Sequence, residues 1–147
     1  MFIATGAYSG YLPVAPGTWG SAVGVLLWLL IGRLEAIPYL SVTGILFVVG
    51  VFSAGAVEKI VDRPDPSIVV IDEIVGQLIA LSLVPAHPAA ALAGFLLFRF
   101  FDIVKPFPAG WIDGHLHGGL GVMLDDVVAG LYALIVLQLG LWLIKAM

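Results

Sequence analysis

The chain is 147 residues long and 61 % hydrophobic, well above the roughly 45–50 % apolar content of soluble domains. Its net charge is −4 with six Lys and Arg residues, which argues against a nucleic-acid partner because nucleic acid requires a basic surface. The absence of cysteine excludes disulfides, thiolate metal sites and cysteine-dependent phosphatase chemistry. We predict one domain, residues 1–147, folded as an all-α integral membrane bundle of about five hydrophobic helices, some short.

The first two apolar segments are long enough to cross a bilayer. Residues 1–17 contain Gly and Pro and predict an ordered loop that leads into the first segment, 18–34. The second segment covers 39–57. Both approach the roughly 17–25 residues that a helix needs to cross hydrocarbon about 30 Å thick. Since no positively charged region precedes the first segment, we expect it to be retained rather than cleaved as a signal peptide.

The third segment spans only if it includes charged residues. Its uncharged part, 74–84, is too short. A helix that begins after Pro66, with Ser67 as its N-cap, is long enough. This start places Asp72 and Glu73 inside the helix, above its first turn.

The last two segments complete the predicted bundle. The fourth, 89–105, contains charges of both signs and ends at two prolines, which cannot continue a helix. Gly and His residues between 111 and 121 predict a loop. The fifth segment, 122–144, opens with Asp125-Asp126 and repeats the acidic pair and apolar rhythm of the third.

Acidic residues are concentrated in the middle and later parts of the chain. A carboxylate near the centre of a bilayer costs roughly 2.5–3.5 kcal/mol. A position near a helix N-terminus offsets only about 0.3–1 kcal/mol of this cost. Capping alone therefore does not explain two adjacent acidic pairs, and we predict a site for a cation. Eight of the ten acidic residues lie in this region: Asp62, Asp65, Asp72, Glu73, Asp102, Asp113, Asp125 and Asp126.

The available ligand types favour Mg²⁺ over Zn²⁺. Mg²⁺ prefers oxygen ligands and is commonly held by one or two carboxylates together with a substrate phosphate. His115 and His117 are two residues apart in a predicted loop, which is not the i, i+4 spacing of a zinc-binding helix. We expect both histidines to face water or lipid headgroups.

Basic and hydroxyl side chains could hold a phosphate. Arg99, Asp102 and Lys105 recur every three residues and so share one face of a helix. Two hypotheses fit this spacing and are compatible with each other: a ladder of ion pairs, and a site in which Asp102 binds the metal while both bases bind phosphate. Thr18 and Ser21 lie where exposed N–H groups of a helix start attract anions.

Four motifs, covering nearly the whole chain, carry a resemblance to a known family. They are Pro13-Val-Ala-Pro-Gly-Thr-Trp-Gly-Ser21, Asp65-Pro-Ser-Ile-Val-Val-Ile-Asp-Glu-Ile-Val-Gly-Gln77, Phe98-Arg-Phe-Phe-Asp-Ile-Val-Lys-Pro-Phe-Pro108 and His117-Gly-Gly-Leu-Gly-Val-Met-Leu-Asp-Asp-Val-Val-Ala-Gly130. In this order they resemble the phosphatidylglycerophosphatase A family of bacterial Mg²⁺-dependent lipid phosphatases. The resemblance implies an all-helical phosphoric monoester hydrolase that converts phosphatidylglycerophosphate to phosphatidylglycerol and phosphate.

The resemblance and the residue chemistry together predict the site. The metal and catalytic candidates are Asp72, Glu73, Asp102, Asp125 and Asp126. The phosphate-binding candidates are Arg99, Lys105, Thr18 and Ser21. Asp62 and Asp65 are expected to support the metal ligands or cap a substrate loop. Attack by a metal-activated water and a covalent aspartyl route both stay open.

The predicted location is a bacterial inner membrane, with several spans and an active site that faces the cytoplasm. With the N-terminus inside, Lys59, Arg63 and Lys105 lie on the cytoplasmic side, and the positive-inside rule favours this by a margin of about one charge. The phospholipid substrate is the expected partner. The alternative hypothesis is a cation- or proton-coupled membrane transporter, in which intramembrane carboxylates carry ions.

Overall fold

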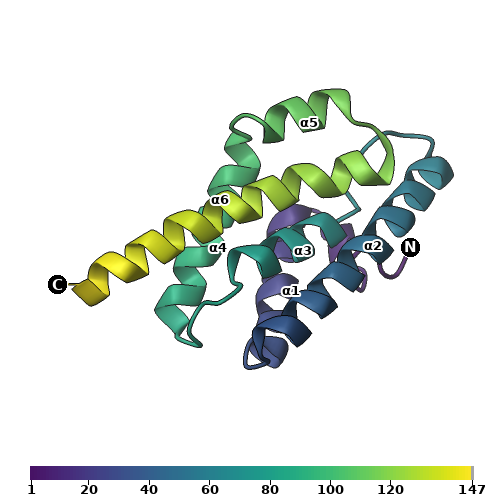
Figure 1. Cartoon of the computed structure of the whole chain (residues 1–147). Coiled ribbons are helices and arrows are strands. Elements are labelled where there is room, and N and C mark those ends of the chain that lie inside the picture. The colour runs from purple at the N-terminus through teal and green to yellow at the C-terminus, as the bar shows by residue number, and fades with distance from the viewer. Residues whose placement is uncertain (147) are drawn as a thin grey trace.

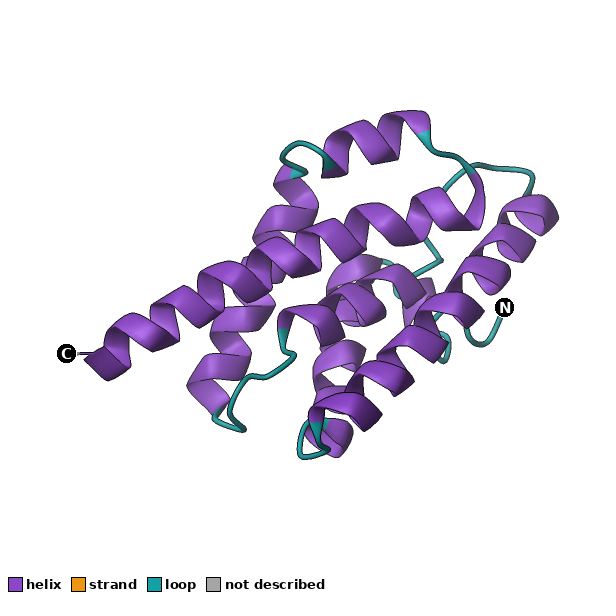
Figure 2. Ribbon diagram, in the orientation of Figure 1, coloured by secondary structure: helices purple, strands orange, loops and turns teal. Residues whose placement is uncertain are grey.

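The computed structural model describes residues 1–146, which form helices and connecting loops with no strand among them. The elements are η1 (Ser9–Tyr11), α1 (Pro16–Ile31), α2 (Ala36–Val61), α3 (Ile71–Ala80), α4 (Pro88–Val104), α5 (Ala109–His115) and α6 (Gly118–Ala146). The predicted all-α class is confirmed, as Figure 2 shows. Five of these helices correspond to the five predicted apolar segments.

α3 is the central element of the bundle. It contacts α6, α1, α2 and α4, and Figure 1 shows it enclosed by these longer helices. Its residues are buried apart from Glu73 and Ile79, which are half-buried. At ten residues, α3 is only about 15 Å long. The predicted helix start after Pro66, which would make the third segment long enough to span, is therefore wrong.

The N-terminus of α3 is capped by a distant segment rather than by Ser67. The carbonyl of Ala4 accepts hydrogen bonds from the backbone N–H groups of Val70 (2.8 Å) and Ile71 (3.2 Å). These contacts satisfy two donors at the helix start that have no partner inside the helix. The acidic pair 72–73 consequently lies in the first turn of α3, not above it.

The C-terminal end of α3 is also fixed by distant side chains. The helix ends at Ala80. The Trp28 indole N–H donates to the carbonyl of Leu81 (3.1 Å), and the Tyr39 hydroxyl donates to the carbonyl of Leu78 (2.6 Å). These bonds satisfy carbonyls that would otherwise need a further helical turn. A short buried helix thus stands in place of the longer third helix that a start after Pro66 would give.

The predicted loop at 111–121 is largely helical. α5 covers Ala109–His115, and α6 already begins at Gly118. A Cβ atom on Gly119 would overlap the carbonyl oxygen of Val51, so glycine is needed where the first turn of α6 meets α2. Because α6 starts early, its acidic pair, 125–126, lies about two turns inside the helix.

The exterior of the bundle is apolar. α2 and α6 are long and apolar enough to cross a membrane, and α1 is a shorter apolar helix. In the most apolar windows of α2 and α6 only 22 % of the residues are buried, so most of their side chains point outward. This arrangement supports the predicted membrane helical bundle, because lipid can solvate these side chains. Exposed side chains include those of Leu26, Leu30, Ile37, Phe52, Ile103 and Ile144.

Two glycines allow α3 and α6 to cross closely. A Cβ atom on Gly130 would lie 2.5 Å from the carbonyl oxygen of Gly76. A Cβ on Gly76 would lie 2.8 Å from the carbonyl oxygen of Asp126. Small residues permit such close approach of helix backbones in membranes. The crossing brings the acidic pair of α3 next to that of α6.

Candidate active site

Three carboxylates from α3 and α6 converge at this crossing. One ligand oxygen each of Asp72, Glu73 and Asp126 lies within 4.8 Å of the other two. Asp72 Oδ1, Glu73 Oε2 and Asp126 Oδ2 are buried and find no hydrogen-bond partner within residues 1–146. Buried like charges at this separation repel strongly unless a positive charge lies between them. The three residues could therefore hold a cation, and an all-oxygen ligand set suits Mg²⁺.

Arg99 and Asp102 form an ion pair at the C-terminal end of α4. Arg99 Nη1 lies 2.6 Å from Asp102 Oδ2 and also donates a hydrogen bond to Ser21 Oγ (3.4 Å). Arg99 thereby links α4 to the start of α1. The pair compensates the charge of Asp102 and keeps the guanidinium beside the acidic cluster.

Lys105 binds α5 and α6 rather than continuing the ladder on α4. Its Nζ lies 2.7 Å from Asp125 Oδ2 and 2.8 Å from Asp113 Oδ1. Burial alone would lower the pKa of Lys105, but hydrogen bonds and charge attraction from Asp113 and Asp125 raise it above its usual value. The ammonium therefore stays charged at neutral pH. The structure splits the predicted ladder into two ion-paired groups.

A small acidic cavity of about 210 Å³ lies among these elements; Lys105 lines it, whereas Arg99 and Asp113 do not. The volume is below the roughly 300–1,000 Å³ of pockets that enclose drug-sized ligands. It suits a phosphate group with a cation better than a whole lipid. Lys105 brings positive charge to a cavity whose other charged lining residues are acidic. The acidic lining residues are Asp65, Asp72, Glu73, Asp102, Asp125 and Asp126.

The start of α1 forms another wall of the cavity, but with different residues from those predicted. Pro16 and Gly17 line it, whereas Thr18 and Ser21 do not. Ser21 is fully buried, donates a hydrogen bond to the carbonyl of Gly17 (2.9 Å) and contacts Arg99. A Cβ atom on Gly17 would overlap Glu73 Oε1. Glycine here allows the backbone of α1 to approach the acidic cluster, a need that the Pro-Gly-Thr-Trp-Gly motif signals only indirectly.

The two outlying acidic candidates occupy different places. Asp65 lines the cavity, and its backbone N–H donates to Glu58 Oε1 (3.0 Å). Asp62 is exposed at the C-cap of α2 and does not line the cavity. Asp113, to which sequence reasoning assigned no role, reaches Lys105 because α5 is a helix rather than a loop.

The histidines lie apart from the acidic cluster. His115 and His117 are exposed, and neither lines the acidic cavity. The His115 ring stacks on Trp111, with centroids 4.8 Å apart. This placement agrees with the expectation that they face the surroundings.

Fold and site together define a helical protein of the membrane type, with a compact acidic site beside two basic side chains that are ion-paired with carboxylates. Comparison with known proteins then shows the family. The family model described as "Phosphatidylglycerophosphatase A" matches residues 2–141. The chain therefore belongs to the phosphatidylglycerophosphatase A family, and the predicted resemblance and enzyme class, a phosphoric monoester hydrolase, are confirmed.

Three curated relatives are similar over most of the chain. "Phosphatidylglycerophosphatase A" of Haemophilus influenzae is 40 % identical over 91 % of this chain and 83 % of its own length. The protein of the same name from Escherichia coli is 36 % identical over 87 % of this chain and 75 % of its own length. A "Putative phosphatidylinositol-3-phosphatase" of Bacteroides thetaiotaomicron is 38 % identical over 98 % of this chain and 94 % of its own length. No solved structure matches the chain. Nothing among these comparisons supports the transporter alternative.

Proposed function

We propose that this membrane enzyme hydrolyses phosphatidylglycerophosphate to phosphatidylglycerol and phosphate with Mg²⁺ as its cofactor. Family membership supports the reaction. The observation that carries the metal proposal is the convergence of Asp72, Glu73 and Asp126, each with a buried oxygen that has no hydrogen-bond partner in the described part of the chain. When bound, Mg²⁺ polarises the phosphate and lowers the pKa of a coordinated water. Water is the attacking group in this proposal.

The cationic side chains balance the charge of the substrate. A phosphomonoester carries about −1.5 to −2 charge near neutral pH, which the carboxylates would repel on their own. Lys105 lines the cavity and holds its charge there through Asp125 and Asp113. Arg99 does not line the cavity but pairs with Asp102, with Arg99 Nη1 2.6 Å from Asp102 Oδ2. Asp102 and Asp125 thus position cations beside the phosphate, while the three clustered carboxylates bind the metal.

We further propose that the enzyme is a multi-pass protein of a bacterial inner membrane, with its site toward the cytoplasm. α2 ends at Val61, and the following loop reaches the cavity at Asp65. Lys59 and Arg63 therefore lie at the same end of the bundle as Lys105. The positive-inside rule favours a cytoplasmic location for that end, by a margin of about one charge.

Phosphate release by purified protein tests the reaction. The protein in detergent is given phosphatidylglycerophosphate or phosphatidylinositol 3-phosphate, with Mg²⁺ or with a chelator. We expect release from phosphatidylglycerophosphate that requires Mg²⁺ and is lost in Asp72→Asn but kept in Asp62→Asn, an exposed acid outside the cavity. Faster phosphate release from phosphatidylinositol 3-phosphate would mean that the preferred substrate carries an inositol headgroup, which contradicts the proposed substrate. Full activity in chelator would rule out the metal.

A further inference from the structure

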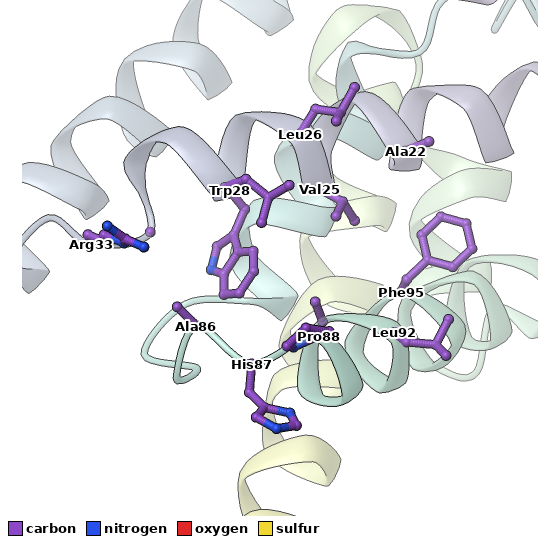
Figure 3. Close-up of a pocket in the computed structure, with 13 residues that line it drawn as sticks. Ala22, Val25, Leu26, Trp28, Arg33, Ala86, His87, Pro88, Leu92 and Phe95 are labelled. Carbon is purple, nitrogen blue, oxygen red and sulfur yellow. The ribbon is translucent and has the colours of Figure 1, made fainter.

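A second, larger cavity lies between α1 and α4. It measures about 660 Å³, within the roughly 300–1,000 Å³ range of ligand-binding pockets. Figure 3 shows Ala22, Val25 and Trp28 of α1 on one side, with Leu92 and Phe95 of α4 on the other. We call this cavity the α1–α4 groove. Its walls are almost entirely apolar, unlike those of the acidic cavity.

The groove begins next to the active site. Ala22 directly follows Ser21, and Phe95 lies one helical turn before Arg99. Arg99 of α4 donates a hydrogen bond to Ser21 of α1 (3.4 Å). This contact joins the two helices and separates the groove from the acidic cluster. From Ala22 the groove extends about 15 Å along α1 to the opposite end, where Arg33 lies (Figure 3).

The side of the groove is open to the surroundings of the bundle. Leu26, Leu29 and Leu92 line it and are each 60 % exposed. Trp28 has its indole N–H bonded to the carbonyl of Leu81, so its polar atom is satisfied and its ring presents an apolar surface. Hydrocarbon from the bilayer can therefore enter the groove sideways without desolvating a polar group.

We propose that the α1–α4 groove binds an acyl chain of the lipid whose phosphate occupies the acidic cavity. The proposal rests on the proposed phosphatase function and adds where the substrate's tail lies. The acidic cavity is large enough for the phosphate but not for the tails, and along α1 the groove starts at Ala22, five residues after Gly17 of the acidic cavity. A membrane already provides an apolar solvent, so the groove gains packing contacts and a fixed lipid orientation rather than hydrophobic transfer energy.

Filling the groove tests this proposal by chain length. Ala22→Phe places an aromatic ring at the end of the groove nearest the site, and Ala56→Phe on the exposed face of α2 is the matched control. We expect Ala22→Phe to raise KM about tenfold for a dipalmitoyl substrate and to leave the dihexanoyl substrate unchanged. Equal effects on both substrates, or none on either, in a protein with an unchanged melting temperature would overturn the proposal.

A second variant guards against misfolding. If Ala22→Phe melts early, Leu92→Trp fills the groove from its exposed rim, where a larger side chain is tolerated more easily. The same chain-length dependence is expected, and its absence from a folded Leu92→Trp protein overturns the proposal.

Binding of a non-hydrolysable analogue separates the groove from the reaction. The probe is a dipalmitoyl phosphonate, titrated in detergent with Mg²⁺ into the wild type, Ala22→Phe and Arg33→Ala. We expect weaker binding only in Ala22→Phe. If this holds while no lipid phosphate is released, the groove stands and the proposed function fails. Weaker binding only in Arg33→Ala would mean that the groove holds a lipid by its far end, which overturns the proposal.

Discussion

The two acidic pairs begin similar sequences but occupy different surroundings. Asp72 and Glu73 lie in the first turn of the short helix α3, where free N–H groups and the helix dipole favour negative charge. Asp125 and Asp126 lie about two turns inside α6, beyond the reach of the helix terminus. The pair in α6 therefore needs other compensation.

Tertiary contacts divide the second pair. Asp125 is neutralised by Lys105 at 2.7 Å. Asp125 Oδ1 and Asp126 Oδ2 are both buried without a hydrogen-bond partner among the described residues, but of the two it is Asp126 that joins Asp72 and Glu73 in the carboxylate cluster. Adjacent, chemically identical residues thus take different roles, because neighbouring helix positions point in directions about 100° apart. The comparison predicts that Asp126 behaves like Asp72, while Asp125 behaves like a partner of Lys105.

The largest effects are expected from the clustered carboxylates. Asp72→Asn and Asp126→Asn remove charge but little volume, and we expect each to lower kcat by about a thousandfold or more. Without metal, the melting temperature of both variants should equal or exceed that of the wild type, because an uncompensated buried charge is removed. The measurements are phosphate release and melting in detergent. A smaller loss in Asp125→Asn would sharpen the comparison, whereas equal losses in Asp125→Asn and Asp126→Asn would break it.

Arg99→Ala should impair both folding and function. The change leaves the mostly buried Asp102 without its ion-pair partner, which lowers the free energy of unfolding by about 3 kcal/mol. The link to Ser21 is also lost. Denaturant unfolding and phosphatase kinetics measure the two effects. Arg99→Lys, which keeps the charge, should recover most of the stability, and an Arg99→Ala protein as stable as wild type would contradict this account.

Lys105→Ala should act mainly on the substrate. We expect KM to rise and kcat/KM to fall about tenfold, because positive charge at the cavity wall is lost while the three clustered carboxylates are unchanged. Mg²⁺ titration should give nearly the same affinity as for wild type. Unchanged kcat/KM would assign Lys105 to stability alone, as a counter-charge for Asp113 and Asp125.

The smallest effects are expected at the exposed histidines. His115→Ala and His117→Ala should change stability by no more than about 0.5 kcal/mol and leave phosphate release with Mg²⁺ or Mn²⁺ unaltered. Neither side chain lines the acidic cavity. Loss of metal binding in either variant would show that oxygen ligands alone do not hold the metal.

Local sequence predicts most of the helices, but it misses α5 and misplaces the ends of α2, α3 and α6 by three or four residues. The helix at Pro88–Val104 lies within one residue of its predicted bounds, since Pro88 is its first residue and Pro106 follows its end. α3 begins four residues later than its predicted N-cap because the carbonyl of Ala4 caps it. α6 begins early because Gly119 fits against Val51. Both boundaries depend on partners far away in the chain.

The sequence by itself indicated the membrane environment, the helical class, the family and the set of acidic candidates. Composition, apolar segment length and contiguous motifs are local properties, so they can be read without the tertiary structure. Only the tertiary structure decided how those candidates are divided. It grouped Asp72, Glu73 and Asp126, turned Lys105 toward Asp125 and opened the α1–α4 groove beside the site. Each of these features depends on how closely helices cross and which side chains meet there. Glycines such as Gly17, Gly76 and Gly130 permit that close approach, but their own sequence neighbourhood does not reveal which backbone they will meet.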